Sequence, residues 1–290
     1  MIIHIKNEYG SIEAGGGNHP SARVLEIRGL GLPSKETKNI VFSGQAGNTL
    51  TNVRDMERVI TLKLDFYGGQ REIEKIYRLI YHEAEILFCF GERRRKIKGI
   101  CVNPEEVEKI IFGTWYSIVL QFRCSNPYFN DFYNTKIPLY QRTNLLPNLY
   151  EENNWYINLP AVATERVNKS KVINYGDTII YPVIYITNTT DRETESELFG
   201  IILQNETTGE FIKLEYNPKP SEQIIIDLPN RKIIGSNTEI LTNYISDDTF
   251  LENFFLKEGE NIISVENLNV NQDISTVMEY NNNYAMAVIG

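Results

Sequence analysis

The second half of the chain is a series of short apolar runs separated by turn-forming residues, and this pattern leaves few folds open. Between residues 161 and 290 the runs are rich in Ile, Val, Leu and Tyr, and clusters of Asn, Thr, Gly and Asp divide them at fairly regular intervals. Such spacing without an intervening helix is typical of an antiparallel sandwich. The sequence therefore predicts an all-β second domain over 161–290, with strands from the runs Thr178–Thr187, Leu198–Leu203, Glu210–Tyr216, Gln223–Leu228 and Asn261–Val265.

The first half changes its hydrophobic period after one long strand. Residues Arg58–Tyr67 alternate, with Ile60, Leu62 and Leu64 on one face, which is the pattern of a half-buried strand. After two glycines the apolar residues recur at helical spacing, which predicts an amphipathic helix near 70–84 that packs on a sheet. One helix among about six strands predicts a split or partly closed β-barrel over residues 1–135; the other strands are expected at 24–32, 40–42, 86–90, 96–102 and 115–124.

Residues 136–160 separate these two patterns. They mix prolines with Asn and Glu and show no sustained period, so they are predicted to be a linker. The expected fold class is mostly β: an α+β first domain followed by an all-β second domain. A chain of 290 residues is long enough for two domains of ordinary size.

The composition argues against several functions. Residues 1–140 carry 19 basic and 16 acidic residues and residues 141–290 carry 10 and 22, so the net charges are +3 and −12. An acidic second half disfavours nucleic-acid backbones and anionic membranes. The N-terminal residues lack the pattern of a secretory signal, which predicts folding in the cytoplasm, and no membrane association is expected.

Catalytic chemistry has little support in the sequence. The three histidines are not placed near a Ser or Cys in a nucleophile motif, and the three cysteines do not show the spacing of a zinc site. The aspartates are not spaced as a calcium loop. We therefore predict no catalytic, cofactor-binding or metal-binding residues, and no cofactor.

Three short segments are candidate sites. The basic cluster Arg93, Arg94, Arg95 and Lys96 is either a rim that meets nucleic acid or an acidic partner, or a solvated hairpin turn. Pro127, Tyr128 and Phe129 follow a strand: the proline stops ladder pairing, and the aromatic residues can pack on the domain edge and fix the direction in which the chain leaves. Four aromatic side chains of the second half are either sugar platforms or packing residues: Trp155, Tyr156, Tyr181 and Tyr185.

The order of several motifs resembles the phage distal tail proteins. The segment "RCSNPYFND" is similar to the point where the first domain of that family ends, and "FSGQAGNTLTNVRDMERVITLKLDFYG" is similar to its G-x-x-G turn followed by an R-x-I-x-L strand. The segment "IIIDLPNRKIIGSNTEILTNYISDDTFLENFFLKEGENIISV" is similar to its closing pattern. Residues 1–20 and those after Val265 carry no part of the resemblance.

The resemblance implies a structural part of a phage tail or tail-like bacteriocin. It implies a split-barrel domain that closes into a hexameric ring at the tail tip, and a galectin-like sandwich as the second domain. The implied partners are further copies of the chain, the tail tube protein, the tail hub and receptor-binding or fibre proteins, after synthesis in the cytoplasm of a bacterial host. In that setting the cluster Arg93–Lys96 is a candidate ring or lumen contact.

Two other functions remain open from the residues alone. One is a carbohydrate-binding β-sandwich used for adhesion, with Trp155 and Tyr156 as candidate sugar platforms. The other is a glycan-cleaving enzyme that uses a pair of carboxylates from the acidic second half.

Overall fold

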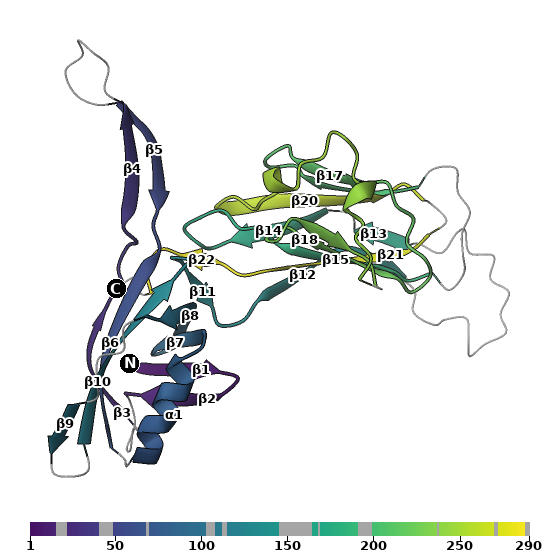
Figure 1. Ribbon diagram of the computed structural model, residues 1–290. Coiled ribbons are helices and arrows are strands. Elements are labelled where there is room, and N and C mark those ends of the chain that lie inside the picture. The colour runs from purple at the N-terminus through teal and green to yellow at the C-terminus, as the bar shows by residue number, and fades with distance from the viewer. Residues whose placement is uncertain are drawn as a thin grey trace, which may run out of the picture. The chain divides into compact units, whose positions relative to one another are not determined.

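The computed structural model describes residues 1–15, 22–40, 49–67, 70–102, 108–111, 115–144, 164–167, 169–190, 199–236, 238–269 and 272–287. Within the described residues the protein is mostly β, as the sequence predicts. The chain divides into two compact units (Figure 1): Met1–Phe132 together with Asn283–Gly290, and Tyr133–Asn282. None of the helices in the described ranges is long and apolar enough to cross a membrane.

Seven strands of the first unit form a closed barrel within the described residues. Each strand pairs with the next, and a pairing between β8 and β10 closes the circle. Neighbouring strands are antiparallel, apart from a parallel contact between β2 and β3. In order around the barrel the strands are β1 (Ile2–Asn7), β2 (Gly10–Ala14), β3 (Ala22–Arg28), β6 (Arg58–Tyr67), β10 (Trp115–Cys124), β8 (Arg93–Cys101) and β7 (Ala84–Phe90).

Every second side chain of β6 points into the barrel and helps to fill its interior. Ile60, Leu62, Leu64 and Phe66 are all buried, and the residues between them are not, so the predicted half-buried strand is confirmed. Across the ladder, β10 contributes its own alternating set to the same core. Because the side chains alternate every second residue, one face of each strand is committed to the interior.

The helix α1 (Gln70–Ile80) is shorter than the predicted 70–84. Leu79 and Ile80 are buried in the barrel core, while the Asn7 side-chain amide at the end of β1 donates a hydrogen bond to the carbonyl of Leu79 at 2.7 Å. This amide satisfies one of the carbonyls that a helix leaves unpaired at its end. Ala84, at the end of the predicted range, instead begins β7.

The barrel closes where a glycine lets two strands approach. A Cβ atom at Gly99 would lie 2.8 Å from the Cys124 sulfur and 3.1 Å from the Arg123 carbonyl oxygen. Gly99 on β8 therefore provides the space for β10 to pair with β8 next to Cys124.

Three short strands add to the barrel sheet, and two more form a separate hairpin. The additions are β9 (Glu108–Ile111), β11 (Phe129–Asp131) and β22 (Asn283–Tyr284). The hairpin consists of β4 (Lys35–Ile40) and β5 (Thr49–Asp55), which pair with each other and with no barrel strand in the described residues. In Figure 1 the two strands run as a ribbon away from the barrel strands. Strand β5 is not predicted by the sequence, because its residues do not alternate between apolar and polar.

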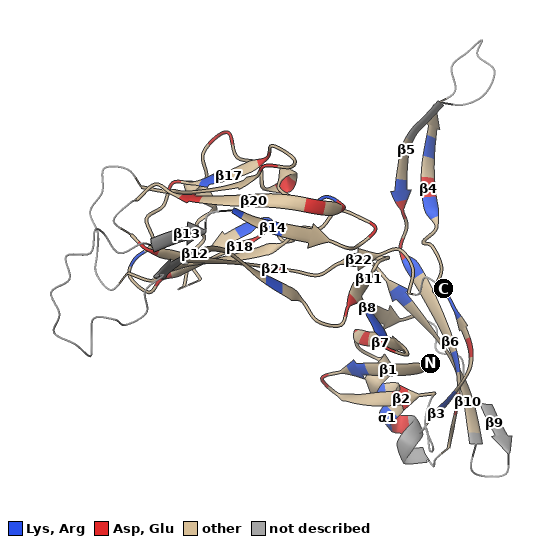
Figure 2. Ribbon diagram, turned by 180° about the vertical axis from the view of Figure 1, so that it is seen from behind, with Lys and Arg blue, Asp and Glu red and all other residues tan. Residues whose placement is uncertain are grey.

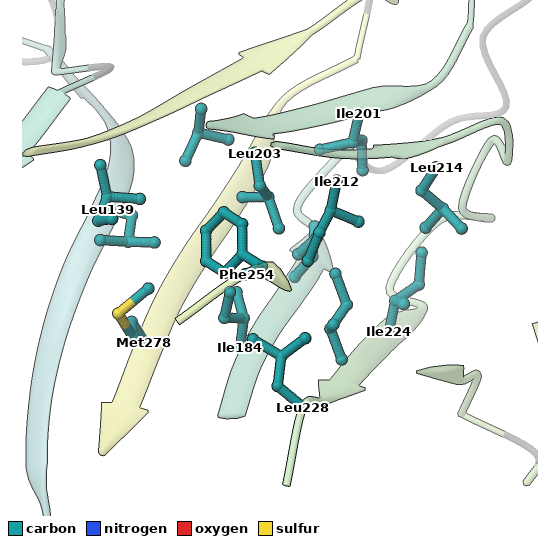
Figure 3. Packing of buried hydrophobic residues seen from close by; sticks show 14 of the residues in the cluster. Leu139, Ile184, Ile201, Leu203, Ile212, Leu214, Ile224, Leu228, Phe254 and Met278 are labelled. Carbon is teal, nitrogen blue, oxygen red and sulfur yellow. The ribbon is translucent and has the colours of Figure 1, made fainter. Parts of the chain in front are cut away.

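The second unit is a sandwich of two antiparallel sheets. The larger contains β13 (Thr164–Val167), β12 (Thr135–Asn144), β21 (Ile274–Tyr280), β15 (Val183–Asn188), β18 (Gln223–Asp227) and β19 (Lys232–Ile234). The smaller contains β14 (Lys169–Asn174), β20 (Gly259–Asn267), β16 (Ile201–Asn205) and β17 (Phe211–Leu214). Two 3₁₀ turns, η1 (Thr242–Tyr244) and η2 (Leu251–Asn253), lie between β19 and β20. Phe254 stands among aliphatic side chains of both sheets in the core between them (Figure 3).

Asparagines end four strands of the sandwich. The side-chain oxygens of Asn174, Asn188, Asn205 and Asn267 each accept a hydrogen bond from the backbone amide two residues later, at 2.8 to 3.2 Å. This contact turns the chain out of the strand. It explains why Asn recurs between the apolar runs.

The course of the chain differs from the predicted domain limits in two places. Strand β12 (Thr135–Asn144) of the sandwich occupies the start of the segment 136–160 that was predicted to be a linker. Residues 283–290, predicted to belong to the second domain, belong to the first unit. They do so because β22 pairs with β11, and because the amide of Ala287 donates to the carbonyl of Leu30 at 3.1 Å.

Candidate functional site

The predicted basic cluster lies on the strand β8, directly after the turn at Gly91 and Glu92. Figure 2 shows the basic residues of β8 beside acidic residues of neighbouring strands. Arg95 forms an ion pair with Asp131 on β11, and its guanidinium lies 3.6 Å from the centroid of the Tyr284 ring on β22. Its side chain is only 20% exposed. Arg95 therefore joins three strands of its own unit.

The other members of the cluster differ in exposure. The ammonium of Lys96 lies 3.8 Å from a carboxylate oxygen of Glu85 on β7, and the Lys96 side chain is 23% exposed. Arg94 is exposed, with its guanidinium 5.8 Å from the centroid of the Phe132 ring, and Arg93 is exposed as well. Arg93 and Arg94 are thus the two members whose positions suit a contact with another molecule.

The segment after β10 packs into its own unit. Phe129 is fully buried, edge to face with Phe88 at a centroid distance of 5.9 Å. The hydroxyl of Tyr128 donates to a carboxylate oxygen of Asp55 at 2.6 Å. Burial, followed by the bond to Asp55, raises the pKa of Tyr128 to about 12. This segment therefore connects the end of β10 both to the barrel core and to the end of β5.

A buried arginine, Arg58, binds the same segment. Its side chain is almost inaccessible, with 4% of the residue exposed, and it donates to four backbone carbonyls. The acceptors are Gly29 at 2.5 Å, Gly31 at 2.6 Å, Pro127 at 2.6 Å and Ala285 at 2.6 Å. Four places in the sequence therefore meet at one guanidinium.

Several further contacts surround the Arg58 guanidinium. It lies 4.6 Å from the centroid of the Phe129 ring, over the ring face. Burial lowers the pKa of Arg58, with opposing effects from Cys124 and Asp55. Burial likewise raises the pKa of the Cys124 thiol to about 11, although the positive charge of Arg58 opposes that rise. The buried Arg58 guanidinium is therefore stabilised by four carbonyl dipoles and by the face of the Phe129 ring.

Arg58 was not among the predicted site residues, although the sequence contains a signal for it. Arg58 is in phase with Ile60 and Leu62 on β6, so the alternation places a cation on the face that is committed to the core. A buried arginine needs acceptors for its five N–H groups. Here the acceptors are carbonyls of glycine, proline and alanine, whose side chains give no indication of the contact.

The predicted aromatic platforms are distributed differently. Trp155 and Tyr156 lie outside the described residues. The Tyr181 hydroxyl donates to the carbonyl of Glu252 at 3.2 Å, and its ring packs edge to face with Phe255. Burial, followed by the neighbouring Glu279, raises the pKa of Tyr185. Tyr181 is thus used in packing within the sandwich.

The described part of the chain contains no cluster suited to a metal ion. No group of three or more His, Cys, Asp or Glu side chains there is arranged to hold a metal ion. A shallow cavity of about 620 Å³ at the ends of β1 and β7 is lined by Lys6, His82, Glu85 and Lys98, among others. Two of the charges that line this cavity are paired with each other, because the Lys6 ammonium binds a Glu85 carboxylate oxygen at 2.9 Å.

Comparisons with known proteins agree on one class of protein. Residues 175–284 match the family model of the siphovirus-type tail component, C-terminal domain. The crystal structure of the Dit protein of phage SPP1, described as a paradigm of the hub adsorption apparatus in phages that infect Gram-positive bacteria, is similar with a TM-score of 0.63. That similarity covers 91% of this chain and 93% of the SPP1 chain at 14% sequence identity.

A second solved structure is similar at lower scores. A chain of the phage P2 baseplate in its activated conformation with calcium gives a TM-score of 0.50 at 11% identity, covering 96% of this chain and 97% of that chain. No curated protein sequence matches this chain. At these identities the two solved structures establish a shared fold, and the match to the family model covers residues 175–284.

Proposed function

Because residues 175–284 match the C-terminal domain of siphovirus-type tail components and the chain resembles phage distal tail proteins, we propose that it is a non-enzymatic ring component of a phage tail or tail-like bacteriocin. The ring would be a hexamer that joins the tail tube to the tail hub and to receptor-binding or fibre proteins. The chain would be made in the cytoplasm of a bacterial host and then assembled into the particle.

The β4–β5 hairpin is the observation that carries the ring proposal. Its side chains are largely exposed, including Ile40 at 45% and Val53 at 44%, and the hairpin has no third strand within the described residues. A two-stranded hairpin by itself is marginally stable in water, and its open edges favour pairing with another chain. A neighbouring copy would cover these edges, and repetition of one such contact around an axis closes a ring.

The exposed arginines of β8 supply a second candidate contact. Arg93 and Arg94 are the exposed members of the cluster at the start of β8, whereas the side chains of Arg95 and Lys96 are partly buried. We propose that Arg93 and Arg94, rather than the whole cluster, face a neighbouring copy or the lumen of the ring.

The mass and shape of the purified protein test the proposal. Light scattering with negative-stain images is expected to show rings of about six times the 33.5 kDa chain, alone or after co-expression with the tail tube protein. Replacement of the hairpin residues 36–54 by a short Gly-Ser turn is expected to abolish the rings. The matched control is Lys171→Glu on the second unit, whose 57% exposed side chain pairs with Glu260. Rings that persist without the hairpin would contradict the proposed contact, and a protein that stays monomeric with the tube protein would contradict the ring.

A further inference from the structure

Both ends of the β4–β5 hairpin, the exit of the chain after β10 and its return at β22 meet around Arg58. We propose that Arg58 is the positioning residue that fixes the direction of the hairpin relative to the barrel, and that it does so fully only when the C-terminal segment 283–287 is docked. The role of the hairpin in a ring rests on the proposed function; its fixation by Arg58 does not.

The start of β4 is held by hydrogen bonds from Arg58 to backbone carbonyls that precede this strand. One terminal nitrogen of Arg58 donates to both Gly29 and Gly31, four to six residues before β4 begins. Gly29 has a φ of +89°, and a Cβ atom there would lie 2.1 Å from the carbonyl oxygen of Val59. The turn is therefore pressed against the start of β6, at a position that only glycine can occupy.

The second end is held through Tyr128. Its hydroxyl binds Asp55, the last residue of β5, while the Arg58 Nε donates to the carbonyl of the preceding residue, Pro127. Between the two ends, the amide of Met56 donates to the carbonyl of Ser34 at 2.8 Å and closes the base of the hairpin. Arg58 and Tyr128 thus fix the hairpin at both of its ends.

The C-terminal segment completes this arrangement. The other terminal nitrogen of Arg58 donates to Ala285, and the amide of Ala287 donates to Leu30, between the two glycines. Ala287 is itself 2% exposed. Without the segment a buried cation loses one of its four carbonyls, and the turn before β4 loses one of its hydrogen bonds. The hairpin is therefore held by residues from both ends of the chain.

Only arginine can make this set of contacts. Its planar guanidinium presents five N–H donors in fixed directions, whereas lysine concentrates three donors on one nitrogen atom. Lysine at this position keeps the charge but cannot reach carbonyls on several sides. Arg58→Lys therefore tests the geometry separately from the charge.

Distance measurements between spin labels test the inference on the full chain. The labels are placed at exposed positions on β4 (Thr37) and β6 (Lys63), with Cys89 and Cys101 replaced by serine, and dilute protein is used to keep it monomeric. In the labelled protein that retains Arg58, we expect one narrow peak in the distribution of distances between the two labels. In Arg58→Lys we expect that peak to be lost. Arg123→Lys, which alters an arginine that is 55% exposed and ion-paired with Glu57, is expected to keep it.

A second variant tests the C-terminal part. Ala287→Arg places a large cation at a buried position and is expected to broaden the peak in the same way. A peak that stays narrow in Arg58→Lys, even if the barrel melts at a lower temperature, would overturn the positioning role. A narrow peak in Ala287→Arg, with the segment displaced as judged by faster amide exchange at position 287, would overturn the dependence on the C-terminal segment. Ring formation is measured in a separate experiment. A fixed hairpin in a protein that never forms rings would refute the proposed ring function and leave the role of Arg58 intact.

Discussion

Replacing Phe129 by alanine should destabilise the first unit and leave the second unchanged. The side chain is fully buried, edge to face with Phe88, and beneath the Arg58 guanidinium. Truncation of a buried Phe costs about 3–5 kcal/mol. The first unit has about 140 residues, and an unfolding entropy of about 2.1 cal/mol/K per residue makes that loss equal to roughly 10–17 °C in melting temperature.

Differential scanning calorimetry measures this effect, with Phe254→Ala as the matched control. Phe254 is also fully buried, but in the core of the sandwich, so its truncation is expected to lower the other transition by a similar amount. Phe250→Ala, at a side chain that is 54% exposed, should change stability by at most about 0.5 kcal/mol. A shift below about 3 °C for Phe129→Ala, or an equal fall of both transitions, would refute the view that this residue anchors the first core alone.

Three other substitutions test separate parts of the first unit. The pKa of Tyr128 is raised to about 12 from an ordinary value of 10.0, so the hydroxyl loses its proton at a lower pH in the unfolded chain than in the folded one. The contribution of Tyr128 to the stability of the folded unit is therefore complete below pH 10 and is lost as the pH rises to 12. Alkaline melting curves should therefore fall less steeply for Tyr128→Phe than for the parent protein between these pH values. Gly99→Ala should destabilise the barrel by about 1–3 kcal/mol in urea unfolding because of its clash with Cys124, and adding Cys124→Ala should restore part of the loss; no restoration would place the strain on the backbone instead. Arg95→Gln should speed amide exchange in β22 more than Arg94→Gln does, because Arg95 contacts the Tyr284 ring; equal rates would contradict its role within the unit.

The parts of the fold that the sequence predicts are those with a local pattern. The alternation of Arg58–Tyr67 predicts β6, and the change to helical spacing after two glycines predicts α1. The regular apolar runs of the second half predict a sandwich, and its asparagines end the strands by contacts over two residues. Each of these signals needs only neighbouring residues, so composition and spacing are enough to detect it.

The missing parts depend on contacts between distant residues. Strand β5 is a hairpin strand that buries little, so it has no apolar alternation to detect. The pairing of β22 with β11 joins residues more than 150 positions apart: the side-chain amide of Asn130 binds that of Asn283 across a separation of 153. The role of Arg95 was not predicted for the same reason, since its partners on β11 and β22 adjoin β8 only in the folded unit.

The first unit is built from two separate stretches of the chain, and this also explains why an arginine lies where they meet. The chain crosses this region at four places, and all four carbonyls that Arg58 binds lie outside the strands, where no ladder can satisfy them. An apolar side chain would fill the same space but would leave these carbonyls buried without donors, each at a cost of about 1–3 kcal/mol. One guanidinium satisfies them together, although burial of its charge is itself unfavourable. The arrangement is explained if it fixes the relative positions of these four segments, as the proposed contact of the hairpin with a neighbouring copy would require.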